Sequence, residues 1–361
     1  RIIHDLAGHE FNLNSPKQLQ EVLFNELKLT PPKKNKTGFS TDIEVLKILQ
    51  FEHAICKELM EYRELAKLKN TYADSLISLI NPTTKKIHAS FNQAVTATGR
   101  LSGSNPNLQN IPVKSELGRK IRRSFIPPRV GDQFLSIDYS QIELRLLAHF
   151  SKDPELLKAY QNNIDIHALT AAKIFGKEPE QIIERERSVG KTVNFGILYG
   201  ISAHGLAEDL EITRVMAKEY IDSFYNGFAE VNSFFENILE NAREVGHVIT
   251  LLGRIRQIPD INASKVLLKN AAERMAKNTV LQGSAADLVK KAMIDTTAWL
   301  KENNYQTKLV LQIHDELVFT VPETEIEAVK QKLKSIMENC VSLNIPLVCD
   351  IAIGENLADL S

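Results

Sequence analysis

Cysteine is scarce in this chain, and so are long apolar runs. The three cysteines, Cys56, Cys340 and Cys349, are odd in number and show no CxxC spacing. This pattern argues against a disulfide framework or a zinc site and fits a reduced, cytosolic compartment. No apolar run reaches about 18 residues and no charged-then-apolar leader is present, so we expect neither a membrane span nor a signal peptide.

An excess of charge of either sign is also missing. Lysine and arginine total 44 against 45 acidic residues among 361, so net charge argues neither for nor against a nucleic-acid partner. The composition, 43% hydrophobic and 25% charged, is typical of a globular chain with two or three subdomains. Because the chain begins at Arg1 without methionine, we expect a piece of a longer protein, and a targeting segment upstream stays open.

The stretch from Leu309 to Val321 has the most distinctive pattern. Apolar residues alternate on both sides of His314, Asp315 and Glu316, which predicts a β-hairpin with three ionisable residues at its tip. Burying adjacent carboxylates costs several kcal/mol unless a cation or hydrogen bonds compensate. An inert, solvated acidic turn is the competing interpretation.

Residues 1–80 are predicted to be mostly helical. We expect one helix over 16–29, a second that begins after the capping residues Ser40–Asp42, and a third over 54–80. A basic loop at 31–38 is expected between the first two helices. The third helix aligns Arg63, Lys67 and Asn70 on one face. That face either tracks phosphates or is simply solvated.

The remainder predicts a mixed α and β chain. We expect strands at 87–95, 134–140 and 347–353, helices from Gln141, over 265–303 and over 325–343, and nearly all helix over 151–263. An amide-rich loop over 105–112 is expected to expose Gln109 and Asn110.

Four residues recur at every fourth position in the helical segment 185–202: Arg187, Lys191, Phe195 and Tyr199. On a helix they form one stripe about 18 Å long, cationic at one end and aromatic at the other. Such a stripe suits a nucleoside triphosphate, although an amphipathic helix with snorkelling cations has the same pattern. Gly196 and Gly200 each weaken a helix by about 1 kcal/mol, which favours a functional reason for them.

Asp138 ends one predicted strand and Asp315 lies at the hairpin tip. If their strands are neighbours, the two carboxylates can hold two divalent ions about 3.5–4 Å apart, which clamp the attacking and leaving oxygens of an in-line displacement. Magnesium suits such a site because it combines carboxylates with substrate phosphates. The pair therefore points to phosphoryl or nucleotidyl transfer.

Together these segments closely resemble the polymerase region of family A DNA polymerases, the bacterial DNA polymerase I type. Residues 138–145, DYSQIELR, resemble motif A, Arg187 to Gly200 resemble motif B, and 312–316, QIHDE, resemble motif C. The segments 96–102, TATGRLS, and 107–112, NLQNIP, resemble two further signatures.

The resemblance implies an α+β fold, a right-hand polymerase with an antiparallel-sheet palm, helical fingers and a helical thumb. The thumb would be residues 1–80, truncated at its N-terminus, the palm 81–150 with 264–361, and the fingers 151–263. The implied reaction is template-directed addition of dNTPs to a primer 3′ end, in DNA replication or repair. Implied partners are primer–template DNA and dNTPs, and we expect a monomer in the cytoplasm of a bacterial or phage-infected cell.

The resemblance also implies roles for individual residues. Asp138, Asp315 and the backbone carbonyl of Tyr139 would bind two Mg²⁺ ions, with Mn²⁺ as a substitute, and Glu316 would support them. Lys191 would donate a proton to the leaving pyrophosphate, completing the catalytic set. The residues implied to bind dNTP are Gln141, Glu143, His167, Arg187, Lys191, Phe195 and Tyr199. Among these, Glu143 would exclude ribonucleotides.

The DNA contacts are expected to read features common to all sequences. A polymerase must bind every sequence, so phosphates and the degenerate minor groove are the expected targets. The residues expected to contact DNA are Arg63, Lys67, Arg100, Gln109, Asn110, Arg254, Arg274, Asn278, Gln282 and His314. Two alternatives stay open: a single-subunit RNA polymerase relative and a catalytically inactive primer–template-binding module.

Overall fold

The computed structural model describes residues 1–32, 34–35, 38–113 and 115–360. The chain divides into two compact units, one comprising Arg1–His88 with Ser115–Ile121 and the other Ala89–Lys114 with Arg122–Ser361. The helix α6, Glu116–Arg123, carries the boundary within it. The predicted thumb falls within the first unit, whereas the division of the second unit into palm and fingers stays a prediction.

The first unit is helical, as predicted. Its helices are α1 Ile2–Ala7, α2 Pro16–Gln20, η1 Glu21–Glu26, α3 Ile43–Leu49, α4 Ile55–Leu68, η2 Lys69–Ala73 and α5 Asp74–Ser78. The Asp42 carboxylate caps α3 by accepting a hydrogen bond from the Val45 N–H at 3.0 Å. Apolar side chains of α2, η1, α3 and α4, including Leu23, Leu46 and Leu59, are fully buried together.

Two expectations in this unit were wrong in detail. The helix expected to reach Leu29 winds into the π-helix η1 and ends at Glu26, because Lys28 takes a left-handed backbone conformation with φ 56°. The expected loop at 31–38 contains a two-stranded pair, β1 Lys34–Asn35 and β2 Gly38–Phe39. Residues 33, 36 and 37 of that loop lie outside the described residues.

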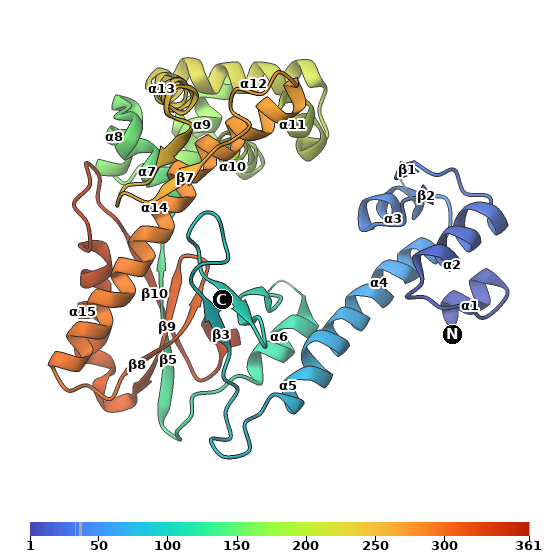
Figure 1. The fold of residues 1–361 in the computed structure, drawn as a ribbon, viewed down its shortest axis with the longest axis horizontal. Helices are drawn as coiled ribbons and strands as arrows, with labels where there is room; N and C mark the ends of the chain where they lie inside the picture. The colour runs from blue at the N-terminus through green and yellow to red at the C-terminus, as the bar shows by residue number, and fades with distance from the viewer. Residues whose placement is uncertain (33, 36–37, 114, 361) are drawn as a thin grey trace. The chain divides into compact units, whose positions relative to one another are not determined.

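The second unit is built on a four-stranded antiparallel sheet in the order β10-β5-β9-β8 (Figure 1). Its strands are β5 Asp132–Tyr139, β8 Lys308–Ile313, β9 Glu316–Pro322 and β10 Cys349–Gly354. The predicted hairpin is confirmed as β8 and β9. Alternation along β5 and β9 turns Leu135, Ile137, Leu317 and Phe319 into the core.

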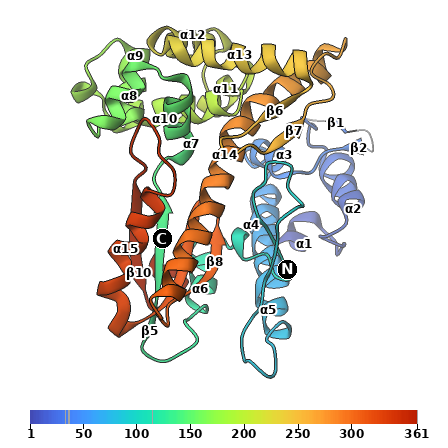
Figure 2. The same cartoon turned by 60° about the vertical axis from the view of Figure 1, so that its left-hand side comes forward.

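Helices complete the second unit. They are α7 Ile142–Ser151, α8 Pro154–Gln161, α9 Ile166–Phe175, η4 Pro179–Gln181, α10 Glu184–Leu198, α11 Ala203–Leu210, α12 Arg214–Gly227, α13 Ala229–Val245, α14 Val266–Glu302, η5 Glu323–Glu325, α15 Ile326–Glu338 and η6 Leu357–Leu360. The long helix α14 runs from the cluster of α9 to α13 down beside the sheet (Figures 1 and 2). No helix in the described part of the chain has the length and apolar character to cross a membrane.

Short β elements account for the remaining differences. The strand expected over 87–95 is only β3 Ser90–Asn92, because its partner β4 Ser102–Ser104 offers three residues for pairing. The segment 151–263, expected to be nearly all helical, contains a hairpin of β6 His247–Ile249 and β7 Ile255–Gln257. At three residues each, β6 and β7 are too short for an alternating apolar pattern to predict them. The helix expected to reach Leu343 ends at Glu338.

The β9 residue Phe319 should dominate the stability of this unit. It is 0% exposed and pairs with Leu135 and Leu309 on the two flanking strands. We expect Phe319→Ala to lower the free energy of unfolding by about 3–5 kcal/mol through lost burial and a residual cavity. Urea unfolding followed by the fluorescence of Trp299, the single tryptophan, would measure the loss.

The control is Val310→Ala on the edge strand β8, where the side chain is 37% exposed. It should cost under about 1 kcal/mol. Equal losses for the two variants would contradict this account of the core.

Candidate active site

The end of strand β5 meets the tip of the β8–β9 hairpin. Asp138 is the cross-strand partner of Glu316, and the N–H of Tyr139 donates to the backbone oxygen of Asp315 at 3.4 Å. The two-ion interpretation required the strands carrying Asp138 and Asp315 to be neighbours. The structure confirms that they are. The side chain of Tyr139 faces the core, where its hydroxyl donates to the Met337 carbonyl at 2.7 Å.

The antiparallel register aligns three carboxylates across the sheet. Asp138 on β5 pairs with Glu316 on β9 and with Asp350 on β10, and Asp315 lies beside them. Asp138 is exposed to solvent, yet desolvation by the surrounding atoms and then the charges of Glu316, Asp315 and Asp350 raise its pKa to about 7. Asp350 is not among the residues predicted from the sequence, because only the strand order places it beside Asp138.

Glu316 is held on the β5 side of the hairpin. It accepts a hydrogen bond from the Ser136 hydroxyl, and the nearby Arg122 guanidinium partly offsets its charge. Burial nevertheless raises the pKa of Glu316 above its ordinary value. One oxygen of the carboxylate is therefore engaged by Ser136, which favours a supporting role for Glu316 over a direct one.

The Arg100 guanidinium offsets the negative charge of two further carboxylates, Glu143 and Asp315. Its Nη2 donates to Glu143 Oε1 at 2.6 Å and lies 3.6 Å from Asp315 Oδ1. Burial raises the pKa of both carboxyl groups, and Arg100 acts against that rise. The Arg100 Nε and the second Glu143 oxygen are buried without a hydrogen-bond partner, so each keeps capacity for another contact.

Gln109 is not the exposed residue expected from the sequence. Its Nε2 donates to the side-chain oxygen of Gln312 at 2.9 Å and to the Gln312 backbone oxygen at 3.2 Å. Gln312 in turn donates to the backbone oxygen of His314. The amide loop is thus tied to the hairpin tip, where His314 is exposed with φ 55°. Asn110 is exposed, as expected.

Three residues of the predicted stripe, Arg187, Lys191 and Phe195, lie on α10, and the fourth, Tyr199, is its C-cap. Arg187 forms an ion pair with Asp165, the N-cap of α9, at 2.6 Å. Hydrogen bonds from Arg187, Ala168 and His167 outweigh the effect of burial and hold the pKa of Asp165 below its usual range. Arg187 is therefore already partnered by an anion.

His167 is only 3% exposed. Burial, reinforced by Arg187 and Lys191, lowers the pKa of His167 to about 4, so its ring is neutral at neutral pH. The Asn194 amide lies 3.0 Å from Nδ1, and Asn194 accepts from the Thr170 hydroxyl at 2.9 Å. This arrangement leaves the proton on Nε2 as a hydrogen-bond donor. Asn194 and Thr170 were not singled out from the sequence.

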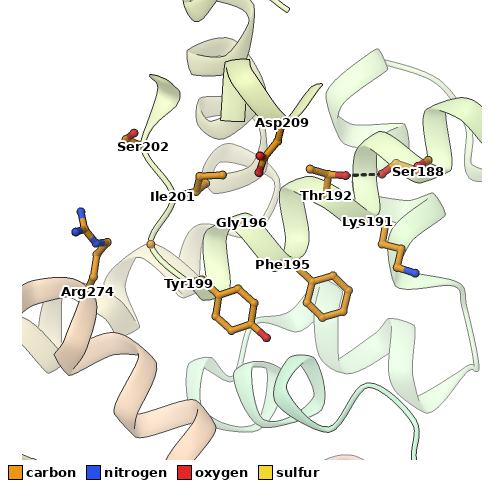
Figure 3. A pocket seen from close by; sticks show the side chains of 11 residues that line it. Ser188, Lys191, Thr192, Phe195, Gly196, Tyr199, Ile201, Ser202, Asp209 and Arg274 are labelled. Carbon is orange, nitrogen blue, oxygen red and sulfur yellow. Dashed lines mark hydrogen bonds between the residues drawn. The ribbon is translucent and has the colours of Figure 1, made fainter. Parts of the chain in front are cut away.

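The aromatic half of the stripe opens on a cavity of about 700 Å³. Phe195 and Tyr199 stack with ring centroids 6.4 Å apart, and Lys191 lies in the same row (Figure 3). Arg274 of α14 lines the far side of this cavity. Burial, then the adjacent Glu143 carboxylate, raise the pKa of Tyr199 to about 12, which links the stripe to the carboxylate group.

Packing and helix termination explain Gly196 in α10 and Gly200, which follows the helix. A Cβ on Gly196 would lie 2.8 Å from Ile201 Cγ2, and one on Gly200 would lie 2.8 Å from Arg274 Cγ. Gly200 also takes φ 66° just after the helix ends. The functional reason favoured from the sequence is not needed for either position.

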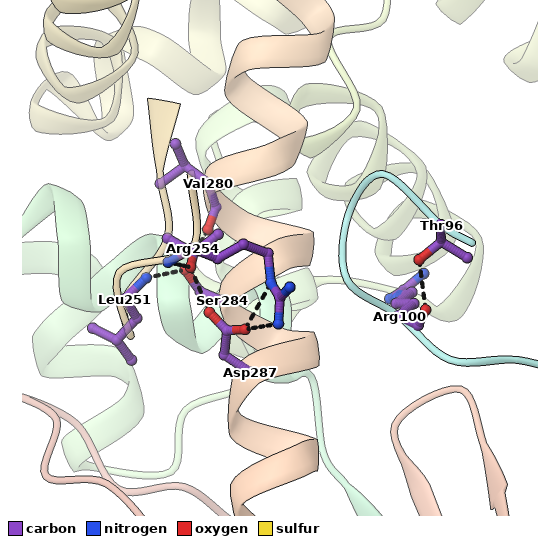
Figure 4. A network of polar contacts seen from close by, with 8 residues as sticks. Thr96, Arg100, Leu251, Arg254, Val280, Ser284 and Asp287 are labelled. Carbon is purple, nitrogen blue, oxygen red and sulfur yellow. Dashed lines mark hydrogen bonds and ion pairs between the residues drawn. The ribbon is translucent and has the colours of Figure 1, made fainter. Parts of the chain in front are cut away.

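A polar network joins the β6–β7 turn to α14 (Figure 4). Arg254 donates to Asp287 Oδ1 from Nε at 3.0 Å and from Nη2 at 2.9 Å, while Thr250 donates to the other oxygen of Asp287. Asp287 is 5% exposed, so this is a largely buried ion pair. Arg254, which is expected to contact DNA, therefore joins the β6–β7 turn to α14 through its ion pair with Asp287.

The remaining predicted contacts lie in two places. On α14, Arg274, Asn278 and Gln282 follow one another at four-residue spacing, and the Asn278 Oδ1 is buried without a partner. In the first unit Lys67 is exposed, whereas Arg63 donates to the backbone and hydroxyl oxygens of Thr41. Arg63 thus fastens α4 to the α3 cap.

The oxygen donors beside Asp138 fit a divalent cation. Desolvation and then the negative charge of these neighbours raise the pKa of Asp138, and a dication would neutralise that charge. Among the described residues, no three His, Cys, Asp or Glu side chains form a ready-made metal site. Magnesium suits such an incomplete set because it uses one or two carboxylates together with substrate phosphates and water.

Comparisons with known proteins agree on one family. The sequence profile described as DNA polymerase family A matches residues 1–359. The DNA polymerase I of Bacillus caldotenax is 47% identical over 358 residues, 99% of this chain and 41% of the relative. That of Treponema pallidum is 47% identical over 357 residues, 99% of this chain and 36% of the relative. The chain thus spans about two fifths of the length of these relatives.

A solved structure is similar throughout. The POL domain of Pol1 from M. smegmatis, in complex with DNA primer–template and dNTP, superposes with a TM-score of 0.93 at 37% sequence identity. The match covers 99% of this chain and 63% of that one.

The repulsion around Asp138 predicts a pH-dependent stability. Its folded-state pKa lies above the ordinary carboxyl value, so its proton favours the folded state at low pH, and this contribution is lost as the pH rises from about 4 to about 7. We expect Asp138→Asn to raise the free energy of unfolding at about pH 8 without metal, by on the order of 1 kcal/mol after solvent screening. The gain should vanish near pH 4.

Chemical denaturation in EDTA across this pH range would measure the difference. Asp222→Asn, which removes an exposed carboxylate on α12, is the matched control and should show no comparable gain. A less stable Asp138→Asn protein at about pH 8 would contradict the electrostatic account.

Proposed function

The chain belongs to DNA polymerase family A, and from this premise we propose that it adds dNTPs to a primer 3′ end under the direction of a DNA template, releasing pyrophosphate. The observation that carries the proposal is the meeting of Asp138 and Asp315 at adjoining strand ends, with the Arg187–Tyr199 stripe linked to them through Glu143. In this proposal the sheet is the palm, α8 to α13 belong to the fingers, and residues 1–80 are thumb.

The carboxylates would hold two Mg²⁺ ions. Asp138, Asp315 and the carbonyl of Tyr139 are the proposed ligands. Such ions, when bound, lower the pKa of the primer hydroxyl and neutralise charge on the phosphates. Glu316 keeps its hydrogen bond with Ser136 and supports the hairpin from the side.

The stripe on α10 would bind the triphosphate. Arg187 exchanges its bond with Asp165 for one to a phosphate, which is favourable because a guanidinium binds phosphate in a bidentate manner. Lys191 supplies an ammonium Nζ and the proton for the leaving pyrophosphate. His167 donates from Nε2 as a neutral ring, so it orients a phosphate oxygen without adding charge.

The aromatic end of the stripe would receive the nucleoside. Phe195 packs against the deoxyribose and Tyr199 supports the nascent base pair, while Gln141 contributes an amide at the same end. Glu143 is 4% exposed and held by Arg100, so its carboxylate is fixed where a 2′-hydroxyl would collide with it. The site thereby favours deoxyribonucleotides.

Primer and template would lie against polar side chains from separate segments. Arg100, Gln109 and His314 approach the primer end, and Arg274, Asn278 and Gln282 follow the template along α14. The other proposed contacts are Asn110, Arg254, Lys67 and Arg63. Minor-groove acceptors are common to all correct pairs, so these donors recognise geometry and not sequence.

Asp315→Ala tests the chemistry apart from binding. Loss of a metal ligand removes several kcal/mol of transition-state stabilisation, so primer extension with Mg²⁺ should fall by roughly 10³-fold or more. The dissociation constant for primer–template, measured by fluorescence anisotropy, should stay within about threefold.

Asp222→Ala on the surface of α12 is the control and should leave both quantities unchanged. An inactive wild-type chain that binds primer–template would support the binding-module alternative. Robust extension by Asp315→Ala would overturn the proposed metal site.

Glu143→Ala tests the sugar gate and the RNA polymerase alternative together. Removing a buried carboxylate from the 2′ side should cut the preference for dNTP over rNTP by about 10–200-fold. Single-nucleotide incorporation on a DNA primer would measure this ratio. Efficient primer-independent rNTP use by the wild type would favour an RNA polymerase, and unchanged sugar selectivity in the variant would refute the gate.

A further inference from the structure

Hydrogen bonds with two other segments hold the turn between β5 and α7 in place. It consists of Ser140 and Gln141 and lies between the proposed metal ligand Asp138 and the proposed sugar gate Glu143. The Ser140 N–H donates to the Val348 carbonyl at 2.8 Å, and the Ser140 carbonyl accepts from Arg145 Nε at 2.8 Å. Gln141 takes a left-handed backbone conformation with φ 54°, so its side chain leaves the turn in a direction set by the fold.

Tyr160, on the neighbouring helix α8, donates a hydrogen bond to this turn. Its hydroxyl donates to Gln141 Oε1 at 3.2 Å, and the residue is only 4% exposed. The Arg145 guanidinium lies 4.6 Å from the centre of the Tyr160 ring and also donates to the Pro346 carbonyl at 2.8 Å. The Tyr160 ring is therefore held in place by the Arg145 guanidinium, which also donates a hydrogen bond to the turn.

The same tyrosine is joined to the proposed triphosphate site. The Ile164 N–H closes the end of α8 by donating to the Ala159 carbonyl at 2.8 Å, and Asp165 then caps α9. Asp165 is the ion-pair partner of Arg187. Tyr160 thus stands between the segment that positions Arg187 and the turn that carries Gln141.

We propose that Tyr160 is a positioning residue, whose hydroxyl fixes the Gln141 amide for the incoming nucleotide. An amide has one acceptor and one double donor. When the phenol occupies Oε1, the Nε2 group is left as a donor toward the nucleotide. Without the hydroxyl, the terminal torsion of Gln141 is free to turn over, because that torsion is broad. This inference rests on the polymerase function proposed above.

A purely structural role makes a different prediction. If Tyr160 only fills the core, its ring matters and its hydroxyl does not. Tyr160→Phe separates the two possibilities, because it keeps the ring, its burial and its contact with Arg145 while removing one oxygen atom.

The experiment is single-turnover dNTP incorporation with Mg²⁺ by wild type, Tyr160→Phe and Tyr225→Phe. The last variant removes a hydroxyl from a half-buried tyrosine of α12 that packs on Phe224. We expect Tyr160→Phe to raise the apparent dissociation constant for dNTP about three- to tenfold, the range of one hydrogen bond. The maximal rate should change less than about twofold, and primer–template affinity should not change. Tyr225→Phe should match the wild type.

A double-mutant cycle with Gln141→Met tests whether Tyr160 acts through Gln141. We expect Tyr160→Phe to add nothing to the loss caused by Gln141→Met. Additive losses would overturn the proposal, and so would wild-type kinetics in Tyr160→Phe, even if its melting temperature fell. Absence of extension by the wild type would instead refute the proposed function itself.

Discussion

Negative charge gathered at the end of β5 is the constraint on which the rest of the site depends. Antiparallel pairing places Asp138 between Glu316 and Asp350, and the hairpin tip adds Asp315. Desolvation and then the repulsion of these neighbours raise the pKa of Asp138 to about 7. Arg100 beside Asp315 and Arg122 beside Glu316 offset part of the negative charge. This concentration of negative charge supports the proposal that divalent cations bind here, because a bound dication would remove an electrostatic cost that the protein already bears.

The arginines proposed to bind the substrate or DNA are each paired with a carboxylate of the protein. Arg187 binds Asp165, Arg100 binds Glu143, and Arg254 binds Asp287. Such pairs keep the arginines oriented and avoid leaving a desolvated charge without compensation. Substrate binding then becomes an exchange of one anion for another. Under the proposed function, the cost of releasing a carboxylate partner would lower the affinity for substrate, while the ion pairs would keep the arginines oriented for binding.

Local patterns predicted the elements of the site well. Alternation identified the β8–β9 hairpin, four-residue spacing identified the α10 stripe, and capping residues located the starts of α2 and α3. Failures occurred where local pattern is weak. The β6–β7 hairpin is too short for alternation, and the π-helical end at Glu26 follows a left-handed Lys28 that propensity does not predict. The exposure expected for Gln109 was wrong because its partner, Gln312, lies far away in the sequence.

The sequence by itself determined which chemical groups are available: the aspartates at strand ends, the cationic and aromatic stripe, and motifs similar to those of one family. These are properties of residue type and short spacing, which local sterics and periodicity convert directly into helices and strands. Only the tertiary structure decided which groups act on one another. Asp350 beside Asp138, Asn194 on His167, Asp287 on Arg254 and Tyr160 on Gln141 are contacts between distant segments. Strand order and helix packing create them, and neither is encoded in any single stretch of the chain.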